Sequence, residues 1–122
     1  MIRTLILCDG IEQIGSGAFY NCNSMINVTI PDSVTSIGNR AFGDCSSMTS
    51  IAILNSVTGV GESVFEDCSS LTSITLPYVG SSADGTGEIN FRVIFGGTSS
   101  VPASLKTVVI TGGTSIGNCA FS

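Results

Sequence analysis

Residues 37–48 read IGNRAFGDCSSM, and closely similar stretches stand 23 residues before and 23 residues after them. Residues 14–25 read IGSGAFYNCNSM, and residues 60–71 read VGESVFEDCSSL. Each stretch leads into two apolar residues two positions apart, such as Ile74 and Leu76. A period in the range of about 20 to 50 residues indicates a solenoid, whose units bury their apolar faces against one another. We therefore expect a single solenoid domain.

Each repeat unit is expected to contain a short strand, a turn with a second strand, and a helical turn, stacked as parallel rungs. Residues 72–76 alternate polar and apolar side chains, which predicts a strand with its apolar side chains inward. A proline turn and residues 34–37 give the second strand, which Gly38 ends. Residues 39–44 follow as one helical or 3-10 turn, with Asn39 placed to cap it.

The shift divides residues 1–122 into about four to five repeats, one of which carries an insertion. The boundaries are 1–10 for a partial repeat, 11–30, 31–53 and 54–76 for full repeats, 77–110 for a long variant repeat and 111–122 for a truncated one. Leu71 and its counterpart Leu105 are 34 positions apart instead of 23. The Gly- and Ser-rich run 79–88 is expected to protrude, with residues 91–95 as the buried part of the long repeat.

The composition excludes several classes of function. Charged residues make up 11% of the chain, where an ordinary soluble domain has about 25%, and only four are Lys or Arg. With a net charge of −5 the basic footprint of a nucleic-acid-binding protein is missing. The chain has no His, which removes the commonest general base near pH 7 and His-ligated zinc. We therefore expect no enzyme, no cofactor and no nucleic-acid partner.

The sequence also argues against membrane insertion. No apolar run approaches the ~20 residues that are needed to cross a bilayer. The apolar N-terminal residues Leu5 and Leu7 align on Val28 and Ile30 of the next repeat, so we interpret them as a strand in register. We expect neither a signal peptide nor a membrane anchor in this chain.

The motif I-G-x-x-A-F-x-x-C-x-x-L-x-x-I-x-I-P, with its 23-residue period, resembles the BspA-type leucine-rich repeat of bacterial surface proteins. Residues 94–96, 101–108 and 112–117 resemble a long variant repeat of the same family. The resemblance implies a leucine-rich-repeat solenoid and secretion or display on the surface of gut and oral bacteria. It also implies a role in adhesion or protein binding rather than catalysis.

Three cysteines, Cys22, Cys45 and Cys68, occupy the same position in successive repeats. Equivalent positions should lie about 4.8 Å apart in a stack, and we expect a column of buried, reduced thiols rather than disulfides. The absence of C-x-x-C spacing makes a zinc site unexpected. Cys8 and Cys119 fall outside the column and are predicted to be the reactive thiols.

Acidic and amide side chains also recur at one position. Asn21, Asp44 and Asp67 share a column, which we assign to turn chemistry, because Ca²⁺ needs about six to eight oxygen ligands. Glu66 and Asp67 form the best available carboxylate pair, but as neighbours on an exposed turn they are expected only to be solvated. We expect no metal site.

The outward positions of the first strand are small and mostly carry hydroxyl groups. Such columns serve as solvent-facing filler in many sheets, but solenoids also present an extended face of this kind to partners. The expected partner is a protein or a glycan, with the 79–88 insertion as a second contact; the alternative is a structural spacer within a longer stalk. The candidate binding residues are Asn27, Thr29, Ser50, Thr72, Ser73, Thr75 and Thr107.

The terminal repeats offer apolar side chains without an obvious charged cap, among them Ile2, Leu5 and Phe121. An uncapped solenoid end exposes apolar surface and strand edges. We therefore expect self-association through the ends, either by symmetric pairing or by head-to-tail stacking.

Overall fold

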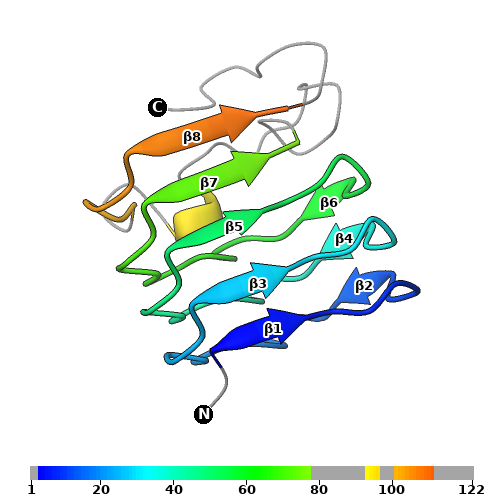
Figure 1. Cartoon of the computed structure of the whole chain (residues 1–122), viewed down its shortest axis with the longest axis horizontal. Coiled ribbons are helices and arrows are strands. Elements are labelled where there is room, and N and C mark those ends of the chain that lie inside the picture. Colours follow the sequence, from blue (N-terminus) through cyan, green and yellow to red (C-terminus); the bar gives the residue numbers. More distant parts are fainter. Residues whose placement is uncertain (1–2, 78–92, 97–100, 112–122) are drawn as a thin grey trace.

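The computed structural model describes residues 3–77, 93–96 and 101–111, and within them the chain forms a stack of short parallel strands in two sheets (Figure 1). The front sheet consists of β1 (Thr4–Ile6), β3 (Asn27–Thr29), β5 (Ser50–Ala52), β7 (Ser73–Leu76) and β8 (Thr107–Ile110). The back sheet consists of β2 (Gln13–Ile14), β4 (Ser36–Ile37) and β6 (Gly59–Val60). The leucine-rich-repeat type of solenoid expected from the sequence is confirmed.

The strands pair in the register that the 23-residue period predicts. Leu5 lies opposite Val28, and Ile51 lies opposite Ile74. The long repeat does not disturb the front sheet, because Ile74 still pairs with Val108. The front sheet therefore keeps its register from β7 to β8.

The core is a set of columns that run along the axis of the stack. Phe42 is fully buried, and its ring stacks on Phe19 at 5.5 Å and on Phe65 at 6.0 Å between ring centroids. Phe95, from the long repeat, continues the column at 6.1 Å from Phe65. The phenylalanines thus form an interior ladder, and the burial expected for the run 91–95 is confirmed for Ile94 and Phe95.

The third side of each turn is not helical, so the expected helical or 3-10 turn in every repeat is wrong. Gly43 donates to the carbonyl of Arg40 at 3.1 Å in a tight turn, but Arg40 and Asp44 have φ values of 55° and 56°. Left-handed residues at such spacing break a helix. The one short helix in the described segments is the 3-10 helix η1 (Val93–Phe95) of the long repeat.

Backbone groups on this side bond to the next turn instead. Phe42 donates to the carbonyl of Val64 at 3.0 Å, and Asp44 donates to the carbonyl of Glu66 at 2.6 Å. The equivalent bonds join the preceding turn, with Phe19 donating to Ala41 at 2.8 Å. We call the segments 17–21, 40–44 and 63–67, joined by these bonds, the turn ladder.

Asn39 is therefore not the cap of a helix. Its Oδ1 accepts a hydrogen bond from the backbone N–H of Glu62 at 2.9 Å, one turn further along the chain. The amide side chain thus accepts a hydrogen bond from a backbone donor of the neighbouring turn. An N-cap residue does the same for a backbone donor of its own helix.

Glycines occupy the place where the second strand leads into the turn ladder. A Cβ atom added to Gly38 would lie 2.5 Å from the backbone nitrogen of Ser16 and 2.9 Å from the carbonyl carbon of Gly15. A Cβ added to Gly61 would lie 2.6 Å from the nitrogen of Asn39. The backbones of successive turns thus approach so closely here that only glycine fits.

Two expectations about the long repeat concern residues that lie outside the described segments. The protruding run 79–88 is one of them, and Phe91 and Arg92 of the proposed buried segment are the other. Among the residues that are described, no helix is long and apolar enough to span a membrane.

Candidate functional site

The outer face of the front sheet carries most of the candidate binding residues. The strand register places Asn27 beside Ser50, Ser50 beside Ser73, and Ser73 beside Thr107. In the second outward column Thr75 lies between Ala52 and Val109. Two columns of short side chains therefore run parallel to the axis across five strands.

The hydroxyl groups of this face differ from a set of Ser and Thr hydroxyls that join successive turns. Those hydroxyls donate to the backbone carbonyl of the preceding turn, as Thr35 does to Glu12 at 3.1 Å and Thr58 does to Thr35 at 3.3 Å. Within the described segments no such bond is made by the hydroxyls of Thr29, Ser50, Ser73, Thr75 and Thr107. These groups remain open to solvent or to a ligand.

Thr72 stands apart from the other candidate residues. It is exposed but precedes β7, and its hydroxyl donates to the carbonyl of Thr49 at 3.0 Å. The structure therefore brings six of the seven candidate residues onto one face and gives Thr72 a bond between turns.

Large apolar side chains border the hydroxyl columns at both ends of the described sheet. Ile6 on β1 is 69% exposed, and Val109 on β8 is 44% exposed. The face thus combines a neutral polar middle with apolar margins, and its outward columns carry no charged residue.

The two buried thiols of the cysteine column are unreactive. The thiol of Cys45 donates to the carbonyl of Phe19 at 3.4 Å, and the thiol of Cys68 donates to that of Phe42 at 3.2 Å. Burial raises the pKa of Cys45 to about 11 and the pKa of Cys68 to about 12. Both remain protonated and unreactive near neutral pH, and the expected buried, reduced thiols are confirmed for these two.

The other cysteines differ in exposure. Cys22, in the first turn of the column, is only half-buried, and Cys8 is exposed, as expected for a thiol outside the column. Cys119 lies outside the described residues.

The two neighbouring carboxylates Glu66 and Asp67 have separate structural roles. Glu66 forms an ion pair with Arg40 at 3.2 Å, and Asp67 occupies a left-handed turn position with a φ of 58°. Asn21 and Asp44 have the same conformation, so the assignment of this column to turn chemistry is confirmed. In the described segments no three His, Cys, Asp or Glu side chains cluster closely enough to hold a metal ion.

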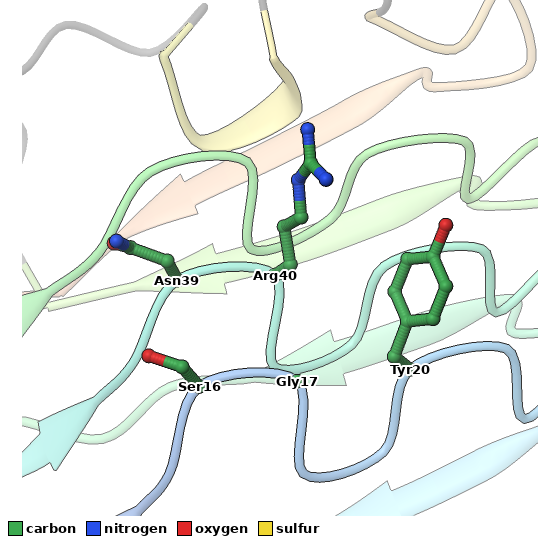
Figure 2. A pocket seen from close by; sticks show the side chains of 5 residues that line it. All are labelled: Ser16, Gly17, Tyr20, Asn39 and Arg40. Carbon is green, nitrogen blue, oxygen red and sulfur yellow. The ribbon is translucent and has the colours of Figure 1, made fainter.

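A shallow depression of about 540 Å³ on the turn ladder was not anticipated from the sequence (Figure 2). It is lined by Ser16, Gly17, Tyr20, Asn39 and Arg40. The signal for it lies in the column that holds Tyr20, because the equivalent position in the next turn is Gly43. When a large residue in one repeat has glycine at the equivalent position of the next repeat, its side chain can pack over that glycine.

Comparison with protein families gives one match over the whole chain. Residues 1–122 match the family described as "BspA type Leucine rich repeat region", with six copies of the repeat. The expected number of four to five repeats is therefore too low, since it left the incomplete units uncounted.

Two crystal structures of bacterial proteins are similar to this chain. A leucine-rich cell surface protein from Faecalibacterium prausnitzii A2-165 is 38% identical with a TM-score of 0.57, over 59% of this chain and 19% of that protein. A leucine-rich repeat protein from Bacteroides ovatus ATCC 8483 is 28% identical with a TM-score of 0.56, over 87% of this chain and 21% of that protein. The chain thus spans about a fifth of each. No curated protein matches the sequence.

Proposed function

The chain belongs to the BspA-type leucine-rich repeat family, and from that premise we propose that it is a non-enzymatic binding or adhesion module of a bacterial surface or secreted protein. The similarity to the cell surface protein of F. prausnitzii supports the location. The partner is a protein or a glycan that docks on the outer face of the front sheet.

The observation that carries the proposal is the distribution of hydroxyl bonds. Six of the Ser and Thr side chains that join successive turns donate to carbonyl groups and so hold the stack together: Ser33, Thr35, Ser47, Thr58, Thr72 and Ser104. The front-face hydroxyls do not take part in this pattern. A row of unengaged hydroxyls on a flat sheet offers both donors and acceptors to a partner.

The chemistry of the face favours a neutral partner surface. Its outward columns hold Asn, Ser, Thr and apolar residues, so binding would rely on hydrogen bonds and on contact with the apolar margins at Ile6 and Val109. Interactions of this kind are insensitive to salt, in contrast to those of charged surfaces.

Substitution of Ser50, at the centre of the face, tests the proposal. Ser50 is exposed on β5, so Ser50→Lys places a long charged side chain over both columns without disturbing the core. Binding to an array of purified glycans and extracellular matrix proteins should fall at least tenfold. Gln13→Lys, on the exposed position of β2 in the back sheet, is the matched control and should bind like the unmodified chain.

The alternative function is a spacer within a longer repeat stalk. It is favoured by the same bonds between turns, which stiffen the stack along its axis. Equal binding by the unmodified chain and the Ser50→Lys variant, or no binding by either, would support the spacer and contradict the binding face.

A further inference from the structure

The depression on the turn ladder lies on a different side of the molecule from the front sheet and has a distinct chemistry. Its residues come from two successive turns: Ser16, Gly17 and Tyr20 from one, and Asn39 and Arg40 from the next. Figure 2 shows Tyr20 and Arg40 directed the same way, with Ser16 beside Asn39 on the adjacent turn. Gly17, which has no side chain, leaves the space between them open.

The ring of Tyr20 is held against the backbone of the following turn. A Cβ atom added to Gly43 would lie 2.9 Å from Cδ2 and 3.0 Å from Cε2 of this ring, so the ring rests on the glycine. Tyr20 is nevertheless 50% exposed. One side of the ring is thus supported by protein while the remainder faces water.

The other polar groups of the lining are oriented but keep free donors. The Nε of Arg40 pairs with Oε2 of Glu66 at 3.2 Å, and Figure 2 shows the other two guanidinium nitrogens pointing away from the backbone. The Oδ1 of Asn39 is used by Glu62, which leaves its amide N–H groups for a ligand. The Ser16 hydroxyl has no hydrogen-bond partner within the described residues.

An exposed aromatic ring and several oriented donors that line one depression match the chemistry of a sugar. A pyranose presents C–H groups that pack on an aromatic ring and hydroxyl groups that accept from guanidinium, amide and hydroxyl donors. We propose that this depression binds a neutral pyranose unit of a glycan, at a site separate from the front-sheet face.

The charge balance selects a neutral sugar over an acidic one. Arg40, the one cationic side chain of the lining, is already neutralised by Glu66. The whole chain carries a net charge of −5, which disfavours the approach of an anion. A carboxylate-bearing sugar would compete with Glu66 for Arg40 against this background.

The tyrosine content makes the site directly observable. The chain has two Tyr and no Trp, so a Tyr78→Phe background leaves Tyr20 as the only tyrosine. Saturation-transfer NMR and the ring resonances of Tyr20 can be followed during titration with methyl β-glucoside, methyl β-galactoside and methyl α-mannoside. We expect saturable shifts with at least one of them at about 1 to 20 mM, the range for a single shallow contact of about 2 to 4 kcal/mol.

Variants separate binding from folding. Tyr20→Ala should weaken binding at least tenfold, whereas Tyr20→Phe keeps the ring and should stay within about threefold. Gly43→Ala changes none of the lining residues but displaces the ring of Tyr20, and should weaken binding about fivefold or more. Gln13→Lys, in the back sheet, should have no effect, and circular dichroism should show all four variants folded.

Three results would overturn the site. They are the absence of saturable shifts with all three glycosides, binding that persists in Tyr20→Ala, and binding of methyl glucuronide in preference to methyl glucoside. None of them depends on Ser50 or on the front sheet, so failure here is distinguishable from failure of the proposed binding face.

Discussion

Replacement of Gly38 by Ala should destabilise the stack, whereas the same replacement at Gly15, the equivalent position one turn earlier, should not. A Cβ atom at Gly38 would meet the nitrogen of Ser16 at 2.5 Å and the carbonyl carbon of Gly15 at 2.9 Å. A Cβ atom at Gly15 would have nothing within 4 Å. The two substitutions are chemically identical and differ only in whether the backbone of the preceding turn lies against the added Cβ atom.

The geometry gives the expected magnitude. To reach an ordinary contact of 3.4 Å, the two turns must separate locally by about 0.5 to 0.9 Å. Two backbone bonds cross this junction, from Gly38 to Ile14 at 2.8 Å and from Gly17 to Asn39 at 2.9 Å, and both would be stretched beyond normal length. Overpacking and weakened hydrogen bonds together correspond to about 2 to 4 kcal/mol.

Urea unfolding followed by circular dichroism measures this difference. With an m-value of about 1 to 3 kcal/mol/M, the midpoint of Gly38→Ala should fall by about 1 to 2 M urea. Gly15→Ala should remain close to the unmodified chain or rise slightly, because alanine restricts the unfolded state. Equal midpoints for the two variants would refute the close approach of the turns.

Two further predictions concern the core columns. Phe42→Ala should lower the free energy of unfolding by about 3 to 5 kcal/mol, because its buried ring stacks on two others, and Phe19→Ala should lower it less, because that ring is only partly buried. A Phe42→Ala protein with an unchanged denaturation midpoint would contradict the ladder. Iodoacetamide labelling of the native chain, mapped by mass spectrometry, should modify Cys8 before Cys45 and Cys68, and a disulfide between the latter two would contradict this order. Because burial raises the pKa of these two thiols above the ordinary 9.0, to about 11 and about 12, the stability they contribute should be complete below about pH 9 and decline as the pH rises through 11 to 12. In a double variant that carries Cys45→Ala and Cys68→Ala, the free energy of unfolding, measured by urea titration, should decline less over that pH range.

The sequence predicted those parts of the structure that depend on side-chain period. Strand alternation and the 23-residue shift together place Ile74 inward and Thr75 outward, and stack Phe42 on Phe65. These assignments needed only the rule that equivalent positions of a solenoid lie above one another. Most of the candidate binding face follows from the same rule, which is why its columns agree with the observed register.

The turn ladder could not be predicted in the same way, because local propensity and contacts between turns oppose each other there. Residues 39–44 carry tight turns that resemble the start of a helix, but the N–H groups of Phe42 and Asp44 bond to the next turn. Gly38 was interpreted as the end of a strand, although its role is to admit the neighbouring backbone. The Tyr20 depression could not be predicted from columns of similar residues, because it arises where Tyr20 and its equivalent Gly43 differ in size.

The hydrogen bonds of the turn ladder also share one direction along the axis of the stack. In each described bond of the ladder an N–H of one turn donates to a carbonyl of the following turn, as from Gly17 to Asn39 and from Arg40 to Glu62. The first turn therefore offers only acceptors to anything placed before it on this side, in the carbonyl groups of Ser16, Ala18 and Tyr20. Two copies approaching with these ends would oppose carbonyl to carbonyl, whereas one copy following another would join donor to acceptor. For the self-association that the sequence predicts, this direction of the bonds favours head-to-tail stacking over symmetric pairing on this side.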